Sequence, residues 1–578
     1  MGNLFVRIPF ILELFFNGIF IMLFSFRFLE KYPFEFLETH INPILKVNSY
    51  ITPFIIFITI LSNFIYSESA EDFFRKHIFS LIVFVPLLFT INDLQFVFWL
   101  SSAHLLSSIL SLYDQEDKIQ HSFDKGSSNS LNIFQILKLS PAQLVLASFL
   151  LVIVFGTFSL MLPFATHSGE SVTFWNALFI STSATCVTGL SPLNIGQEFT
   201  MFGQIVILFL IQIGGLGIMT LSSSMAILLG KAMGMKDRIV LQDLLDVSSL
   251  EDLLAMITDI IRYTLVIELW GAIILTFAFT YDGFEFTQAL YYGIFHSVSA
   301  FCNAGFALFD NSLESYALNP LIHGTISILI ILGGLGFIVL KETRNVLLKP
   351  KSFARFTLHT KIVYVMSAGL TLFGALFIFF GEFLGALDGF SLYEKIQISL
   401  FQSITLRTAG FNTIPLTNLN SFTIYGISLL MFIGASPGST GGGIKTTTLA
   451  ILLQSIRSTI KGRKEIDLYD RSIQPVTVVK ATALTFISII ITSFFILLMM
   501  KIEPEQSFLS IFFEVVSASG TVGLSLGLTP VLSVAGKLAI SLVMFIGRVG
   551  PITLLLAIGQ QKQTRGKFDY PVGRIMIG

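Results

Sequence analysis

Four short segments of the chain repeat one pattern, in which a helix-like run is followed by a few small or polar residues and then a glycine. The segments are Ser183–Leu190, Ser299–Phe306, Ile404–Phe411 and Ser517–Leu524. The glycine that all four share recurs after 116, 105 and 113 residues, at Gly189, Gly305, Gly410 and Gly523. A period this regular indicates one structural unit used four times. Four units that each carry a glycine loop can surround a single axis, as a cation filter requires.

The composition places most of this chain in a membrane. Of its 578 residues, 53% are hydrophobic and only 12% are charged, and the mean hydropathy is +0.80. A soluble domain carries about 25% charged residues, so most of the surface must face membrane lipid. The net charge of -1 gives no sign of a nucleic-acid partner. The histidines are scattered and no carboxylate pair lies in a span, so we do not expect an enzyme.

Apolar runs long enough to span a bilayer come in pairs after about residue 140. The pairs are 141–164 with 200–229, 263–281 with 319–341, 361–383 with 421–455, and 474–500 with 531–559. Between the members of each pair lies a shorter apolar segment, at 171–184, 286–300, 391–404 and 506–519. Such segments suit re-entrant helices, because they are too short to cross the membrane. We therefore expect an all-α integral membrane protein with four pseudo-fourfold repeats of outer helix, pore helix, filter loop and inner helix around one pore.

The repeats divide most of the chain. We expect pore repeats at 141–238, 239–345, 346–465 and 466–560, followed by a basic cytoplasmic tail at 561–578. Before them we expect an N-terminal transmembrane block of three or four helices at 1–112 and a polar cytoplasmic linker at 113–140. The loops between repeats are basic, whereas the loops beside the glycine segments are acidic. Because cytoplasmic loops carry the excess of Lys and Arg, this pattern predicts that the filter loops face outside.

A dehydrated cation needs oxygen atoms at a fixed radius, which potassium channels supply as rings of main-chain carbonyls. Glycine keeps side chains away from the axis and permits positive φ. A lone glycine after an apolar run usually marks a turn, but four in one register favour a filter. We predict potassium at the four shared glycines. The predicted ion-binding residues are Val187, Thr188, Gly189, Asn303, Ala304, Gly305, Thr408, Ala409, Gly410, Thr521, Val522 and Gly523.

The third inner-helix segment contains a stretch too rich in glycine to remain helical. It consists of Gly434, Ala435, Ser436, Pro437, Gly438, Ser439, Thr440, Gly441, Gly442 and Gly443. We expect this stretch to unwind beneath the filter and to act as a gate. Arg548 in the fourth inner helix is a second candidate gate residue, because charges inside spans mark functional sites. Its side chain either hydrogen-bonds the carbonyls of the stretch or forms a static ion pair with a carboxylate, for which Glu514 is one possible partner.

These motifs resemble those of the Trk/Ktr/HKT superfamily of potassium transporters, most of all the membrane subunit of a bacterial Ktr or Trk potassium uptake system. The resemblance covers about residues 138–578 and rests on five motifs. They are Thr185–Leu190, Phe301–Phe306, Arg407–Asn412, Gly520–Leu524 and Gly434–Thr447. Residues 1–112 depart from the family pattern, because this block is longer than the usual extension.

The resemblance implies a potassium-selective transporter of the cell (inner) membrane. Glycine at all four filter positions implies potassium, whereas serine in the first loop is associated with sodium-permeable plant members. The family also implies a homodimer on a cytoplasmic ring of regulator-of-conductance (RCK/KTN) domains, which bind ATP/ADP or NAD(H); we expect no cofactor in this chain. Transport is either channel-like or a symport with sodium or protons. The alternative function is a sodium-permeable or sodium/proton-coupled cation transporter of the same fold.

Overall fold

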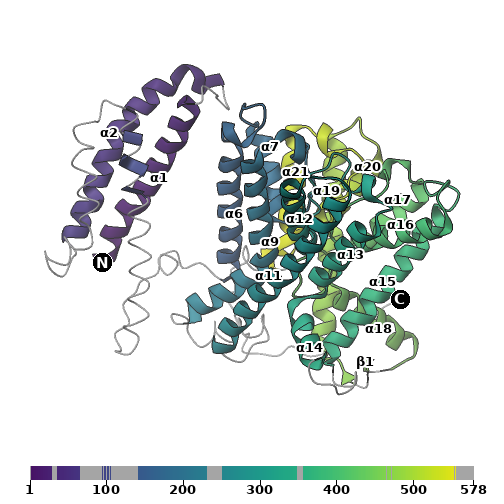
Figure 1. Cartoon of the computed structure of the whole chain (residues 1–578). Helices are drawn as coiled ribbons and strands as arrows, with labels where there is room; N and C mark the ends of the chain where they lie inside the picture. Colours follow the sequence, from purple (N-terminus) through teal and green to yellow (C-terminus); the bar gives the residue numbers. More distant parts are fainter. Residues whose placement is uncertain are drawn as a thin grey trace, which may run out of the picture.

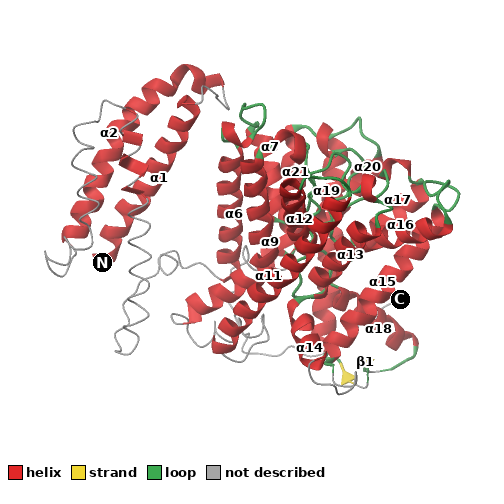
Figure 2. Ribbon diagram, viewed as in Figure 1, coloured by secondary structure: helices red, strands yellow, loops and turns green. Residues whose placement is uncertain are grey.

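The computed structural model describes residues 2–28, 35–65, parts of 94–105, 141–230, 250–347, 356–551 without 464 and 470, and 553–554. The described chain is almost entirely helical (Figures 1 and 2). Its strands form one small hairpin, β1 (Asp467–Leu468) with β2 (Arg471–Ser472). The expected helix at 78–92, the linker at 113–140 and the tail at 561–578 lie outside the described residues.

Helices stand where each of the four repeats was expected. The first unit has α6 (Pro141–Leu160), α7 (Phe174–Thr185) and α9 (Met201–Gly230), and the second has α11 (Leu250–Tyr281), α12 (Phe286–Phe301), α13 (Pro320–Leu335) and α14 (Phe337–Leu347). The third has α15 (Leu358–Gly381), α16 (Leu392–Thr405), α17 (Ser421–Met431) and α18 (Thr446–Ile460). The fourth has α19 (Pro475–Ile502), α20 (Phe508–Gly520) and α21 (Val534–Val549). Short turns complete the units: η2 (Pro163–Ala165), α8 (Ile195–Glu198), η3 (Glu314–Tyr316), η5 (Leu416–Asn418) and η6 (Thr529–Val531).

The four units pack in a closed cycle. Each pore helix contacts the inner helix of the unit before it in the chain. The contacting pairs are α12 with α9, α16 with α13, α20 with α17, and α7 with α21. The last pair joins the first unit to the fourth, so the cycle closes around one centre. The pore helices and filter loops therefore lie at the centre, and the outer helices lie around them.

The apolar surface of the outer helices suits a membrane. Among the described residues, four helices are long and apolar enough to cross one, and α13 with α14 is a fifth candidate. The four are Ile41–Ile60, Thr258–Tyr281, Leu358–Gly381 and Pro475–Ile502. Large apolar side chains on the outer helices, such as Phe277, Phe380 and Leu497, are exposed. Lipid is the solvent in which such an exposed surface is stable.

The expected uninterrupted helix over 319–341 is wrong at Gly336. There the chain bends by 102° between α13 and α14. Gly336 has φ of +94°, and a Cβ atom at this position would collide with the carbonyl oxygen of Pro437. The N–H of Phe337 donates to the carbonyl of Gly438 at 2.9 Å. The second inner helix breaks because its backbone packs directly on the glycine-rich stretch of the third.

The N-terminal block contains α1 (Gly2–Phe28) and α2 (Glu35–Ile65), which pack against each other. Figure 1 shows the two helices side by side. The described part of 94–105 is helical and packs on both, with Val97 beside Phe20 and Leu45 in one apolar cluster. The described residues of the block thus contain α1, α2 and helical positions between 94 and 105.

Candidate cation filter and gate

The pore helices end in the same hydrogen-bonded turn in three of the four units. In the first, the N–H of Thr188 donates to Ser183 O at 2.8 Å, and the N–H of Val187 donates to Ala184 O at 3.1 Å. This pair of bonds is a Schellman motif, which places the residue after the helix cap in the left-handed region. Equivalent pairs end α12 and α20. The third unit differs, because Ala409 N–H donates to Thr405 O instead.

The left-handed residues in these turns are not glycines. Val187, Asn303, Thr408 and Thr521, each two positions before a filter glycine, have φ between +52° and +72°. A left-handed non-glycine residue costs roughly 1–2 kcal/mol, and the branched Val and Thr side chains are the least suited to it. Our prediction of positive φ concerned only the glycines, so propensity alone did not indicate this column. Four strained residues in one register point to a functional constraint on the loops.

The four glycines meet in a ring. A Cβ atom added to Gly189 would collide with the carbonyl oxygen of Ala304, and one added to Gly305 would collide with that of Ala409. The same holds from Gly410 to Val522 and from Gly523 back to Thr188. Each glycine thus lies against the main chain of the next loop, and the fourth returns to the first. The structure brings all of the predicted filter residues together in this ring.

Two further features fit the ring to a cation. The N–H groups of Gly189 and Gly523 donate to the hydroxyls of Ser183 and Ser517, both at 3.1 Å, so these N–H groups do not need a partner at the centre. The carboxyl end of each pore helix points toward the ring, and the helix dipole places partial negative charge at that end.

The third inner helix is interrupted as predicted. Helix α17 ends at Met431 and α18 begins at Thr446. We call residues 432–445 between them the gate loop. Ile433 and Ile444 form a parallel bridge that holds the two ends of the loop together. The predicted gate residues from Gly434 to Gly443 all lie within it.

The gate loop lies against the filter turns. A Cβ atom at Gly441 would collide with the hydroxyl of Thr408, and one at Gly442 would collide with that of Thr521. The Thr521 hydroxyl accepts a hydrogen bond from the N–H of Gly442 at 3.1 Å. On the opposite side, Ser436 and Thr440 donate their N–H groups to Gly334 O and Gly333 O in α13. Only a loop without side chains at these glycines fits between the filter and α13.

Arg548 connects the gate loop to the first inner helix. One guanidinium nitrogen donates to the carbonyl of Thr440 in the loop, and the other donates to Gly214 O in α9 at 2.5 Å. The side chain is buried. Glu514 instead accepts hydrogen bonds from the hydroxyls of Ser525 and Thr529, and no ion pair joins it to Arg548. Of the two alternatives predicted for Arg548, the structure thus has the bond to the loop.

A cavity of about 200 Å³ lies beside the gate loop, between it and helices α19 and α21. Its lining includes Lys445, Arg548 and apolar side chains such as Leu484 and Ile546. Lys445 donates from Nζ to the carbonyl of Gly441 at 2.7 Å, so it ties the loop to the start of α18. The gate loop therefore borders an open space on the side of α19 and α21.

Comparison with known proteins assigns the family. A profile of the TrkH family, described as a cation transport protein, matches residues 135–565. The chain belongs to the TrkH family. The match includes all four filter loops, the gate loop and Arg548. TrkH proteins are transporters rather than enzymes, as the composition and motifs predicted.

Relatives of this TrkH-family chain align with about three quarters of its length. It is 37% identical over 448 residues to the Ktr system potassium uptake protein B of Bacillus subtilis, covering 77% of this chain and 98% of the relative. It is also 37% identical over 446 residues to the potassium/sodium uptake protein NtpJ of Enterococcus hirae, covering 76% and 98%. The fold is similar to that of the potassium transporter TrkH from Vibrio parahaemolyticus, with a TM-score of 0.57, 18% identity, and coverage of 89% and 97%.

The contact between Thr521 and the gate loop of this TrkH-family chain leads to a prediction. Substitution of Thr521→Val keeps the side-chain shape but leaves the buried N–H of Gly442 without its acceptor, which costs about 1–3 kcal/mol. We expect the loop to dock less firmly and basal cation flux in liposomes to rise about fivefold or more. The control is Thr325→Val, which loses only a hydroxyl bonded within α13. Equal flux in the two variants would show that the bond does not hold the loop.

Proposed function

We propose that this chain transports potassium through the ring of four filter loops and that the gate loop closes the path. The observation that carries the proposal is the closed order of the ring, in which each filter glycine lies against the carbonyl of the next loop. A ring of main-chain oxygens around one axis replaces the hydration shell of an alkali ion. The carbonyls of Thr188, Ala304, Ala409 and Val522, with those of the flanking residues, supply these oxygens.

Potassium is the preferred ion because all four filter positions carry glycine and because relatives of this chain are named potassium uptake proteins. Each filter loop has only one glycine in the shared position, and none has the Thr-Val-Gly-Tyr-Gly sequence of potassium channels. The ring therefore holds fewer ion sites than the filter of a potassium channel. A sodium-permeable or sodium/proton-coupled transporter is the second candidate, which the name of the Enterococcus hirae relative favours.

The gate loop is the element that moves. In the closed state, Arg548 holds it by the carbonyl of Thr440 and places a positive charge on the cation path. Opening moves the loop toward the cavity beside α19 and α21 and breaks this bond. The displacement needs no refolding of α17 or α18, because glycines supply the backbone freedom of the loop.

Regulation comes from the cytoplasmic side in this proposal. The ends of α14 and α18 carry exposed basic residues, among them Arg344, Arg457 and Lys461. In a homodimer of this chain, these residues form the surface to which a cytoplasmic RCK/KTN ring binds. The ring binds the regulatory nucleotide, ATP/ADP or NAD(H). The filter loops face outside, because basic loops stay in the cytoplasm.

The substitution Gly189→Ser tests the selectivity. Gly189 has φ of +94°, and its Cβ position is taken by the carbonyl of Ala304, so serine must displace one side of the ring. We expect flux of potassium and rubidium to exceed that of sodium in liposomes containing the unmodified chain, and the variant to lose this preference. Gly283→Ser is the control, since Gly283 also has positive φ but meets nothing within 4 Å. Equal potassium and sodium flux before substitution would refute potassium selectivity.

A further inference from the structure

One carboxyl group outside the filter and the gate loop is buried near the middle of a candidate membrane span. Glu268 lies in α11 within the span Thr258–Tyr281, and its side chain is only 6% exposed. Both of its oxygen atoms accept hydrogen bonds from other elements. Nε2 of Gln212 in α9 donates to Oε2 at 3.3 Å, and the thiol of Cys302 after α12 donates to Oε1 at 3.8 Å. We call Glu268, Gln212 and Cys302 the polar trio.

The polar trio lies next to the second filter loop. Cys302 caps α12 and immediately precedes Asn303, the left-handed residue of that loop. A Cβ atom at Gly215 would collide with Sγ of Cys302, so the thiol packs directly on α9. The hydroxyl of Ser297 in α12 donates to the main-chain oxygen of Glu268 at 2.7 Å. Side chain and main chain of Glu268 thus both contact the pore helix that leads into the filter.

The repeat places the same positions at the boundary between the fourth and first units. The hydroxyl of Ser181 in α7 donates to Ile153 O at 2.7 Å, as its counterpart in α12 does to Glu268 O. Ile153 therefore corresponds to Glu268. Cys186 caps α7 as Cys302 caps α12, so the two cysteines also correspond.

The third corresponding residue is Phe545 in α21, which takes the place of Gln212. Each stands two residues before a glycine whose Cβ position collides with a main-chain oxygen at the end of its own pore helix. Ile153, Cys186 and Phe545 pack in one apolar cluster. Since an apolar set builds the same corner of the fold, packing does not require a carboxyl group at Glu268. A charge inside a span without a packing role marks a functional site.

We propose that Glu268 binds a proton at membrane depth, beside the second filter loop. An ionised carboxylate is costly there, because its partners in the polar trio are an amide and a thiol, which carry no positive charge. A proton from solution forms an O–H bond on Glu268 and leaves the trio neutral. The thiol of Cys302 then donates to Oε1 of Gln212, which is 3.7 Å from Sγ. Protonation therefore changes the hydrogen bond at the cap of α12.

The bound proton lowers the affinity of the ring for potassium, a consequence that rests on the proposed function. The ionised carboxylate places negative charge close to the second filter loop and favours a cation in the ring. A proton on Glu268 removes this charge. We therefore expect acidification to raise the potassium concentration that gives half-maximal flux, with little change in the maximal flux.

Other charged and titratable groups near the polar trio have partners of their own. The described part of α9 from 201 to 217 has none. Arg262 on α11 is exposed, more than one turn from Glu268. The remaining groups are Asp259 with Lys341 and Tyr263 with Arg344 on α11, Tyr291 with Gln204 and His296 with Tyr292 and Leu308 on α12, and His323 against Phe401 on α13.

Arg548 also reaches α9 beside the polar trio, where it donates to Gly214 O, two residues after Gln212. Arginine keeps its charge at every pH of interest. It therefore supplies a constant field, and a change at the trio on acidification reports the protonation of Glu268.

Infrared difference spectroscopy of the full chain in liposomes tests the site. On acidification at constant potassium concentration, we expect the C=O band of a buried carboxylic acid to appear and the S–H band of one cysteine to shift. Glu268→Gln should abolish both changes, and Cys302→Ala should remove the S–H band that shifts. Cys186, in its apolar cluster, supplies an S–H band that stays constant.

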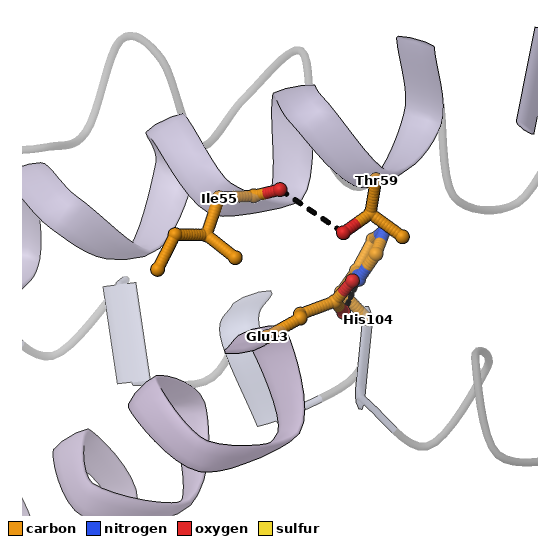
Figure 3. Close-up of polar contacts among 4 residues, drawn as sticks. All are labelled: Glu13, Ile55, Thr59 and His104. Carbon is orange, nitrogen blue, oxygen red and sulfur yellow. Dashed lines mark hydrogen bonds and ion pairs between the residues drawn. The ribbon is translucent and has the colours of Figure 1, made fainter. Parts of the chain in front are cut away.

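Two other buried carboxyl groups provide matched controls. Glu514 in α20 accepts hydrogen bonds from two hydroxyls, and Oε1 of Glu13 in α1 lies 2.7 Å from Nδ1 of His104 (Figure 3). Glu514→Gln and Glu13→Gln should leave the S–H shift unchanged, because the thiol of Cys302 bonds to Glu268 and Gln212 instead.

Flux measurements in the same liposomes test the link to the filter. In the unmodified chain, acidification should raise the half-saturating potassium concentration roughly threefold to tenfold. Glu268→Gln should make this concentration independent of pH, and Glu268→Asp should restore the dependence. A merely structural role would instead lower the maximal flux of Glu268→Gln at every pH.

A double variant keeps the test decisive if Glu268→Gln does not assemble. Glu268→Ile with Gln212→Phe copies the apolar set of the first unit, so we expect it to assemble and to lose the S–H shift. A shift that persists in this variant, or one that sodium produces at constant pH, would overturn the proton site. Titrating bands with no effect of pH on flux would overturn the link to the filter. The infrared result does not depend on potassium transport, so a chain that titrates but carries no potassium would contradict the proposed function alone.

Discussion

Replacing Arg548 by methionine should leave the transporter open. The side chain donates two hydrogen bonds, to Thr440 O in the gate loop and to Gly214 O in α9. Each bond from a charged donor contributes about 1.5–3 kcal/mol. Only the bond to Thr440 O is broken when the loop opens, so its loss shifts the equilibrium toward the open loop by about 1.5–3 kcal/mol, roughly tenfold to a hundredfold. We expect potassium flux into liposomes to rise strongly in the absence of any cytoplasmic partner.

Arg548→Lys separates the two contributions of this residue. Lysine keeps the positive charge but does not reproduce the planar fork that reaches both carbonyls. If the bonds hold the loop, the lysine variant leaks almost as much as Arg548→Met. If the charge alone excludes cations, the lysine variant stays closed and the methionine variant leaks. Unchanged flux in both variants would contradict a role for Arg548 in closure.

Gly410→Ala should have the second largest effect, a loss of potassium flux. Gly410 has φ of +79°, and its Cβ position overlaps the main-chain oxygen of Val522. Because the obstacle is backbone, it moves only if the fourth loop moves, and the ring then loses its shape. We expect flux to fall more than about tenfold, which corresponds to about 1.4 kcal/mol in the barrier.

Gly527→Ala is the matched control for Gly410→Ala. Gly527 has φ of +86°, so alanine there carries a similar backbone strain, but its Cβ position meets nothing within 4 Å. The control should retain flux within about twofold, because strain alone is about 1–2 kcal/mol of stability and leaves the ring intact. Equal losses in the two variants would attribute the effect to folding rather than to the filter.

The sequence predicted the helices and the glycine ring because both depend on local rules. Hydrophobic run length distinguishes spanning helices from re-entrant ones, and the four pore helices begin and end close to the predicted positions. The column of glycines is visible because only glycine tolerates both the positive φ and the close carbonyl. The loss of helix between Met431 and Thr446 follows from the same conformational properties of glycine and proline.

Features set by contacts between units were not predictable from local sequence. Val187 and Thr521 adopt left-handed conformations that their side chains disfavour, because the turn after each pore helix imposes them. The break at Gly336 arises from its contact with Pro437 and Gly438, which lie about a hundred residues further along the chain. Likewise, Arg548 bonds Thr440 and Gly214 rather than Glu514, a choice that only the packing of four inner helices determines.

Locating a bound heavy alkali ion in crystals tests most directly whether the four loops coordinate one cation. Rubidium diffuses into the site of potassium and can be located by its anomalous scattering in crystals of the full chain. We expect a peak on the axis of the ring, coordinated by main-chain oxygens from all four loops, including those of Thr188, Ala304, Ala409 and Val522. A ring without a peak, or a peak coordinated by oxygens of a single loop, would contradict the filter.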